Sequence, residues 1–282
     1  MVPAPARTTL RILSAVAPPL AVRLGARAFG TVGPPARVRS IDAAVHAEAV
    51  RGTVQVGHDQ VATYTWEPPG PVRATVLLVH GWRTRASRFG TLVGHLRAAG
   101  VRVVAYDAPG HGDSGGHHLT VVEHMAAMHA VTGRHGPVDA VVGHSLGAFT
   151  AGIALHEGFP ARHLVALASP TGFDSVVATF RRLAGVPDRL HEPLCAHLAR
   201  TLFPGQDDVR DRFDLRAHPA GVPAVFVHDT EDTVHGPGEA VDLHAAHPGS
   251  RLVLTRGLGH NRVLDDAAVA RAVVEHVTGV HA

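Results

Sequence analysis

The residues of this chain that could do chemistry centre on the pentapeptide Gly143-His144-Ser145-Leu146-Gly147. A serine hydroxyl is a poor nucleophile unless a base takes its proton and a tight turn exposes it. Glycines two positions before and two positions after Ser145 leave room for that turn, where a Cβ would collide with a neighbouring element. A strand-like run over residues 138–142 precedes the pentapeptide, and a helix-like run over 148–157 follows it. This context favours Ser145 as a nucleophile.

A candidate acid and a candidate base follow Ser145 along the chain. His260 lies in Leu258-Gly259-His260, directly after the last predicted strand, and Asp232 lies in the loop after the strand that ends near His228. Asp229 in the same loop is the alternative acid. The three residues follow the order nucleophile, acid, base, and each lies beyond the end of a different predicted strand. We therefore expect Ser145, Asp232 and His260 to form a catalytic triad.

Attack by a serine on a carbonyl creates an oxyanion, which needs two backbone N–H donors. The first is predicted to come from Leu146, at the start of the helix that follows the nucleophile. The second is predicted to come from Trp82 in His80-Gly81-Trp82, the turn after the apolar run 74–79. An ordinary strand-end turn at His80-Gly81 is the alternative interpretation.

Apolar runs that alternate with amphipathic stretches must position these residues. Short continuous runs of Val, Leu and Ala between helices are typical of a parallel sheet covered on both faces. We therefore predict an α/β fold with a mostly parallel, doubly wound sheet. The predicted strands are 53–56, 61–66, 74–79, 101–106, 138–142, 163–168, 224–228 and 251–255, and the predicted helices are 86–99, 120–135, 146–157, 238–246 and 265–277.

The alternation stops between residues 172 and 222, where no strand-like run occurs. Leucines recur there at every fourth position, which indicates one face of a helix; they are Leu190, Leu194, Leu198 and Leu202. We expect this insertion to be a helical cap over the carboxyl ends of the strands, where open α/β sheets bind ligands. Ordinary packing of a helix on the core is the alternative. Phe173 and Phe180 are candidate substrate contacts on the same grounds, together with His144 beside the nucleophile.

Taken together, these motifs resemble the α/β-hydrolase superfamily over residues 60–280, and most closely its small serine esterases with a helical cap. The matching segments are His80-Gly81-Trp82, Asp107-Ala108-Pro109-Gly110-His111-Gly112-Asp113-Ser114, the pentapeptide around Ser145, Asp232, and Gly259-His260. One departure is Asp229, where many members have glycine. The resemblance implies an α/β-hydrolase fold with the cap inserted before the acid-bearing strand.

The resemblance also implies an activity. Ser145 would attack a carboxylic ester of a small acyl substrate, with a thioester or an amide as further substrates, and form an acyl-enzyme. Acyl transfer, perhydrolysis and C–C bond hydrolysis use the same triad and stay open, as does a non-catalytic protein that binds a ligand or partner. No cofactor is expected. No metal is expected either, because the spacing of His111, His117, His118, His124 and His129 matches no standard zinc pattern.

Composition limits the remaining possibilities. Hydrophobic residues make up 45% of the 282 residues and charged residues 18%, which is typical of a globular protein. Cys195 is the single cysteine, so the fold needs no disulfide, and a reducing, cytoplasmic location is expected. All 26 basic residues are arginine. Six of them and no acid lie in residues 1–40, which leaves 20 basic against 24 acidic residues in the rest of the chain. A nucleic-acid partner is therefore not expected.

The N-terminal 45 residues are predicted to be a basic and apolar helical extension of a hydrolase domain over residues 46–282. Residues 8–29 mix arginines with large apolar side chains, and their apolar stretch 12–22 is too short to cross a bilayer. Pro18-Pro19 interrupts it. Three interpretations stay open, namely a helical extension packed on the domain, a helix in weak contact with a membrane surface, and a cleaved secretory signal.

Overall fold

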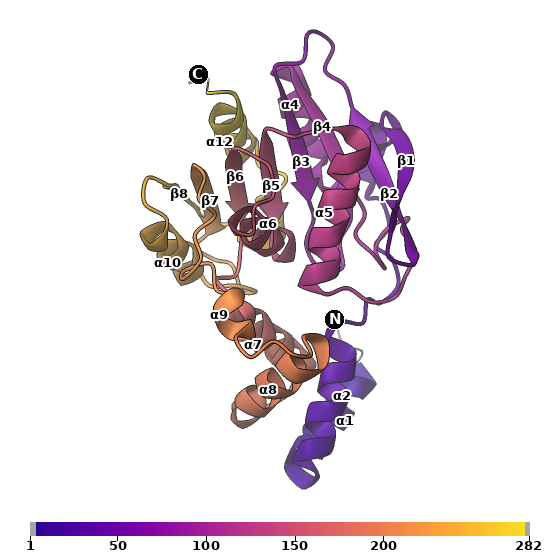
Figure 1. The fold of residues 1–282 in the computed structure, drawn as a ribbon, viewed down its shortest axis with the longest axis vertical. Coiled ribbons are helices and arrows are strands. Elements are labelled where there is room, and N and C mark those ends of the chain that lie inside the picture. Colours follow the sequence, from indigo (N-terminus) through magenta and orange to yellow (C-terminus); the bar gives the residue numbers. More distant parts are fainter. Residues whose placement is uncertain (1–3, 280–282) are drawn as a thin grey trace.

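A computed structural model describes residues 4–279 and contains one eight-stranded sheet (Figure 1). The strands lie in the order β1-β2-β4-β3-β5-β6-β7-β8. β1 and β2 pair antiparallel, β2 pairs antiparallel with β4, and all other neighbours are parallel. The strands are β1 (Val50–Val56), β2 (Asp59–Trp66), β3 (Ala74–Val79), β4 (Val101–Tyr106), β5 (Ala140–His144), β6 (His163–Leu167), β7 (Ala224–Asp229) and β8 (Arg251–Thr255). The predicted α/β fold with a mostly parallel sheet is confirmed.

Alternate residues of β3 face two different apolar cores. Val76 and Leu78 belong to the core under α4 and α12, while Leu77 and Val79 belong to the core under α5 and α6. Both faces of the sheet are therefore covered by buried apolar side chains, which explains why the central strands are continuous apolar runs. The helices over the sheet are α3 (Ser40–Ala47), η1 (Ala86–Phe89), α4 (Gly90–Ala98), α5 (Val121–His135), α6 (Leu146–His156), α10 (Gly238–Ala246), α11 (Gly259–Arg262) and α12 (Ala267–Thr278).

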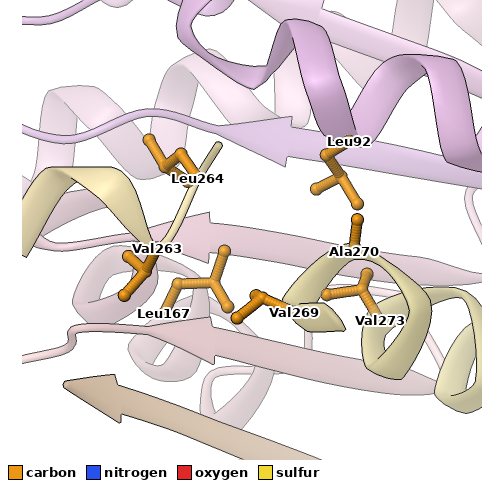
Figure 2. A pocket seen from close by; sticks show the side chains of 7 residues that line it. All are labelled: Leu92, Leu167, Val263, Leu264, Val269, Ala270 and Val273. Atoms are coloured by element: carbon orange, nitrogen blue, oxygen red, sulfur yellow. The ribbon is translucent and has the colours of Figure 1, made fainter. Parts of the chain in front are cut away.

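Figure 2 shows a part of the first core, where α4 and α12 meet β6. The side chains there are all hydrocarbon, and the space between them is too small for a water molecule. The lining residues are Leu92, Leu167, Val263, Leu264, Val269, Ala270 and Val273. This small cavity is therefore a packing feature of the core and has no room for a ligand.

Several element boundaries differ from the sequence-based expectation, and two of these differences lie near the predicted site. The helix predicted over 86–99 begins with the short 3-10 helix η1, whose Ala86 N–H donates to Asp107 Oδ1 at 2.8 Å; short 3-10 segments are frequent at the start of helices. The strand predicted over 138–142 lies at Ala140–His144, because Gly143 and His144 stay paired with β6 as far as the nucleophile. Strand pairing therefore continues directly into the turn at Ser145.

The chain adds two groups of helices at the carboxyl end of the parallel strands (Figure 1). The first is the N-terminal hairpin, and the second is inserted between β6 and β7. Arg189 of the insertion donates to the Ser14 carbonyl oxygen of the hairpin at 2.5 Å, and α2 packs along α8. These helices are α1 (Ala4–Val16), α2 (Pro18–Phe29), α7 (Phe173–Ala184), η2 (Asp188–Leu190), α8 (His191–Leu202) and α9 (Val209–Arg212).

The two groups of helices form one layer, because α2 lies against α8 and α1 against α7. The N-terminal helices pack on the inserted helices. The predicted division into residues 1–45 and 46–282 stays a prediction. Among residues 4–279, no helix combines the length and apolar character that crossing a bilayer requires.

Candidate active site

The turn that carries Ser145 connects β5 to α6 in a backbone conformation that residues other than glycine rarely adopt. Ser145 has φ 55° and ψ −124° and is only 8% exposed. A Cβ on Gly147 would lie 2.1 Å from the carbonyl oxygen of Val79, and a Cβ on Gly143 would lie 2.4 Å from Ala148 Cα. Both positions therefore require glycine. Strain of this kind is typical of functional turns held in place by the surrounding structure.

Ser145, His260 and Asp232 form one hydrogen-bonded row. His260 Nε2 lies 3.0 Å from Ser145 Oγ, and His260 Nδ1 lies 2.7 Å from Asp232 Oδ2. The other carboxylate oxygen of Asp232 accepts from the backbone N–H groups of Val234 and His235, at 2.7 and 3.1 Å. The structure thus brings together the three side chains expected at the ends of β5, β7 and β8.

The Asp232 carboxylate is held in its charged form. Burial alone would raise its pKa, but hydrogen bonds with His228 and His260 outweigh burial and lower the pKa well below its usual range. A charged acceptor at 2.7 Å keeps the proton of His260 on Nδ1. Nε2 is then free to accept a proton from Ser145.

His228 is a residue of this site that sequence reasoning missed. It is fully buried at the end of β7, and its Nε2 lies 2.9 Å from the His235 carbonyl oxygen and 3.3 Å from Asp232 Oδ2. Burial lowers its pKa, but Asp232 and this carbonyl have the larger combined effect, so that the pKa is raised. A histidine that interrupts a buried apolar strand next to a predicted acid was the available signal.

Asp229, the alternative acid, has a different set of partners. Its Oδ2 accepts from Thr255 Oγ1 at 2.8 Å and from the Leu258 N–H at 2.9 Å. Burial by itself would raise the pKa of Asp229, but the backbone N–H groups of this loop lower it to about 2. Asp229 therefore anchors the loop that carries His260, whereas Asp232 contacts His260 itself.

The predicted oxyanion donors lie next to the nucleophile. A Cβ on Gly81 would lie 2.9 Å from Ser145 Cβ, so the turn after β3 passes directly against the serine. Leu146 begins α6, and its N–H is one of the helix N-terminal donors that have no partner within the helix. Within residues 4–279, the N–H groups of Trp82 and Leu146 donate to no backbone or side-chain acceptor. Both are available to a ligand.

Two buried histidines hold the turn that contains Trp82. His80 Nδ1 lies 2.8 Å from the Gly81 carbonyl oxygen, and its Nε2 accepts from the Ala108 N–H at 2.8 Å. His111 Nε2 accepts from the Arg83 N–H at 3.0 Å, and Arg83 has φ 56°. Burial lowers the pKa of His80 to about 4 and that of His111 to about 3, so both rings are neutral acceptors at neutral pH.

Comparison with known proteins identifies the family of this chain. Residues 76–272 match the family model described as the alpha/beta hydrolase family. The chain belongs to this family. A segment of 110 residues is 31% identical to the monoacylglycerol lipase of Mycolicibacterium smegmatis, and the match covers 36% of this chain and 38% of that relative.

Solved structures of similar fold include an esterase and a phospholipase. An esterase of Pyrococcus furiosus has a TM-score of 0.66 at 18% identity and covers 89% of this chain and 97% of its own. A membrane phospholipase A, described as a bacterial virulence factor, has a TM-score of 0.64 at 18% identity, with 96% and 97% covered. At this identity the likeness shows that the chain has the α/β-hydrolase fold, as the sequence motifs predicted.

The residues expected to contact substrate in this α/β hydrolase lie in three different places. His144 is buried behind the base, and its Nε2 donates to the His260 carbonyl oxygen at 2.8 Å; burial, and then the nearby His260, lower its pKa to about 3. The ring of Phe173 lies 6.4 Å from that of Phe203, within the inserted helices. The ring of Phe180 lies 5.1 Å from that of Phe29 on α2. Substrate contact by these three residues stays a prediction.

One group of possible metal ligands occurs among residues 4–279 of the hydrolase. Asp174, His191 and Cys195 offer ligand atoms within 4.8 Å of one another. A guanidinium already occupies this group, because Arg210 Nε lies 2.8 Å from Asp174 Oδ1. Burial raises the pKa of the Cys195 thiol to about 11, so it is neither a nucleophile nor a thiolate ligand at neutral pH.

Proposed function

We propose that this protein is a serine hydrolase that cleaves a carboxylic ester of a small acyl substrate through an acyl-enzyme at Ser145. The observation that carries the proposal is the hydrogen-bonded row in which His260 lies 3.0 Å from Ser145 Oγ and 2.7 Å from Asp232 Oδ2. The esterase and lipase among the similar proteins support an ester as the substrate class.

The proposed reaction begins with proton transfer. His260 Nε2 takes the proton of Ser145 as Oγ attacks the ester carbonyl carbon, and the imidazole becomes an imidazolium. Asp232 stabilises that positive charge, because its carboxylate stays ionised beside Nδ1. His260 then protonates the departing alkoxide. Water, activated by the same imidazole, hydrolyses the acyl-enzyme and restores Ser145.

The tetrahedral intermediate carries a negative charge on the former carbonyl oxygen. In the proposed mechanism, the N–H groups of Trp82 and Leu146 donate to this oxygen. Their positions are fixed before substrate arrives, by the bonds of His80 and His111 to the turn and by the start of α6. In other enzymes, loss of one such donor costs about 10²–10³ in turnover.

Three further residues are proposed to support this chemistry by holding the loops that carry the base and the acid. His144 and Asp229 hold the loop that carries His260, from the side of β5 and from the side of β7. His228 Nε2 lies 2.9 Å from the His235 carbonyl oxygen and 3.3 Å from Asp232 Oδ2, and these contacts keep the acid loop in place. They are positioning residues.

The proposal is tested by labelling with a fluorophosphonate probe and by assays with simple esters of increasing acyl-chain length. Wild-type protein is expected to be labelled and to hydrolyse part of the series. Ser145→Ala should lose the label and lower the turnover number by up to about 10⁶. Ser40→Ala, on an exposed residue that begins α3, is the control and should retain both.

Two outcomes would overturn the proposal. Undiminished ester hydrolysis by a folded Ser145→Ala variant would exclude Ser145 as the nucleophile. Labelling at Ser145 with no hydrolysis across the ester series would exclude esters and favour one of the other reactions of the same triad. Circular dichroism and thermal unfolding of each variant establish that the fold is retained.

A further inference from the structure

The end of the molecule formed by the N-terminal hairpin and α8 exposes apolar side chains among arginines. We call this surface the helical tip. In Figure 1 the hairpin extends away from the sheet, at the end of the molecule opposite the C-terminus. We define the helical tip by the exposed residues of α1, α2 and α8 that are large and apolar or are arginines, namely Ile12, Val16, Leu20, Arg7, Arg11, Arg23, Arg27 and Arg200.

The apolar members of the helical tip face water. Ile12 is 58% exposed, Val16 is 74% exposed and Leu20 is 45% exposed. Leu10 and Ser14, on the opposite side of α1, are 4% and 1% exposed and face the molecule. Ile12 and Val16 therefore lie on a face of α1, and Leu20 on a part of α2, that other residues in the range 4–279 leave largely uncovered.

A groove next to these side chains extends the apolar surface. It has a volume of about 410 Å³ and lies between α2 and α8. Its lining is mostly apolar, with two arginines and one histidine. The lining residues are Pro18, Pro19, Val22, Arg23, Leu190, Pro193, Ala196, His197 and Arg200.

Among residues 4–279, no ion pair joins an arginine of the helical tip to an acidic residue. Residues 1–40 contain no Asp or Glu. Within residues 4–279, none of the five arginines of the helical tip is in an ion pair, and all five side chains are exposed. Several arginines elsewhere in the molecule are in ion pairs, as Arg85 is with Asp107 and Arg88 is with Asp265. Since the rest of the chain carries more acidic than basic residues, positive charge is concentrated at this end.

We propose that the helical tip docks on the surface of a membrane that contains anionic phospholipid. Ile12, Val16 and Leu20 would enter the region between headgroups and acyl chains, while the arginines contact phosphate groups, to which the guanidinium fork is well suited. A helix with this mixture of apolar and basic faces lies in the plane of the interface. Polybasic segments of this kind are attracted to anionic lipid.

A second copy of the chain fits this surface less well. A symmetric dimer through the helical tip would bring the same patch of each copy together. Its unpaired arginines would then face identical arginines, and like charges across an interface are unfavourable. An anionic membrane supplies instead the negative charge that this end of the molecule lacks.

Docking would also orient the proposed active site. The inserted helices α7 and α8 connect the helical tip to the loops at the ends of β6 and β7. In the docked state these loops would lie near the membrane surface, where amphiphilic acyl esters gather. Docking itself does not depend on the proposed hydrolysis, because the surface shares no residue with the row around Ser145.

The test is co-sedimentation of the full chain with vesicles of phosphatidylcholine, with and without phosphatidylglycerol. Wild-type protein should bind the vesicles that contain phosphatidylglycerol and lose binding as salt is raised. The triple variant Ile12→Asp, Val16→Asp, Leu20→Asp should lose binding. Arg23→Gln with Arg200→Gln should weaken binding by about fivefold for each arginine removed.

A matched triple variant controls for added negative charge. Val72→Asp, Val122→Asp and Leu254→Asp alter side chains that are 52%, 40% and 48% exposed on other parts of the surface. This variant should bind more tightly than the triple variant of the helical tip. Ser145→Ala should bind vesicles as the wild type does, so that failure of docking and failure of the proposed hydrolysis are seen separately.

Three results would overturn the proposal. These are absence of wild-type binding, equal binding to vesicles with and without phosphatidylglycerol, and unchanged binding by the triple variant of the helical tip. Analytical ultracentrifugation completes the test. A dimer that dissociates in the same triple variant, with no vesicle binding by the wild type, would identify a second copy as the occupant.

Discussion

Histidine has several different tasks around Ser145, and the partners of each ring determine which one it has. His260 bridges Ser145 and Asp232, whereas His144 donates to the backbone carbonyl of His260. His80 and His111 accept backbone N–H groups and so hold the turn after β3. Of the 23 histidines in the chain, a few are neutral structural groups, and one, His260, is the proposed base.

At the residue scale, the two aspartates of the acid loop should respond differently to the same substitution. Asp232→Asn removes the charge beside His260 Nδ1, and a comparable change in a known triad lowers turnover by about 10⁴. Asp229 Oδ2 accepts hydrogen bonds from the Leu258 N–H and the Thr255 hydroxyl. Asp229→Asn removes the negative charge of this acceptor, which should lower the free energy of unfolding by about 1–3 kcal/mol.

Steady-state ester hydrolysis and urea unfolding of both variants measure the difference. The Asp232 variant should show the larger loss of turnover, and the Asp229 variant the larger loss of stability. A larger loss of turnover in Asp229→Asn, at a temperature where it is folded, would contradict the assignment of the acid.

At the element scale, the connection between β5 and α6 depends on close approach of backbones. Gly147→Ala would place a Cβ 2.1 Å from the Val79 carbonyl oxygen of β3, so either β3 or α6 must move. We expect a loss of several kcal/mol in the free energy of unfolding, at or beyond the usual range of about 1–3 kcal/mol for overpacking. Urea unfolding, or the yield of folded protein, measures it.

Gly94→Ala is the matched control for this substitution. Gly94 is exposed in α4, and a Cβ there would meet no atom within 4 Å. Because alanine favours the helix and restricts the unfolded chain, the variant should gain about 0.4–1 kcal/mol. Equal effects at the two positions would show that close contact at Gly147 is not the cause.

At the scale of the whole molecule, the basic charge is concentrated at the end of the fold where the N-terminal and inserted helices lie. The N-terminal hairpin and the inserted helices share one end of the fold, and the basic excess of the chain lies there. The sheet lies at the other end, where exposed large apolar side chains such as Val72, Val122 and Leu254 lie far apart along the chain. This asymmetry underlies the proposed orientation on a membrane.

Buried histidines should make the stability of the whole molecule depend on pH. Burial lowers the pKa of His80 to about 4, and the pKa values of His111 and His144 to about 3, from 6.5. Below pH 6.5 the unfolded chain therefore binds protons that the folded state excludes. The contribution is fully present above pH 6.5 and decreases by about 1.4 kcal/mol per pH unit for each histidine as pH falls toward 4.

Urea unfolding at a series of pH values measures this dependence. His111→Gln should reduce the slope between pH 6 and pH 4, because it removes one of the three groups. His58→Gln, at an exposed position in the turn after β1, should leave the slope unchanged. A free energy of unfolding that is constant across this range would contradict the prediction.

The sequence by itself determined the fold class and the order of its elements. Continuous apolar runs have to be buried, and their alternation with amphipathic stretches left a covered parallel sheet as the simplest solution. It also determined the turn at Ser145, because the glycines at 143 and 147 around the serine stand between a strand-like run and a helix-like run. That Gly147 lies against Val79 of β3 was decided by the tertiary structure. The family match over residues 76–272 confirms the resemblance drawn from these motifs.

Only the tertiary structure decided which aspartate contacts His260 and where the N-terminal helices lie. Asp229 and Asp232 are three residues apart, and their different partners come from loops 26 to 29 residues further along the chain. The roles of His80 and His111 likewise depend on contacts with segments 28 residues away in the chain. Periodicity records which side of an element is buried, whereas the identity of the partner across a contact is set when distant segments pack together.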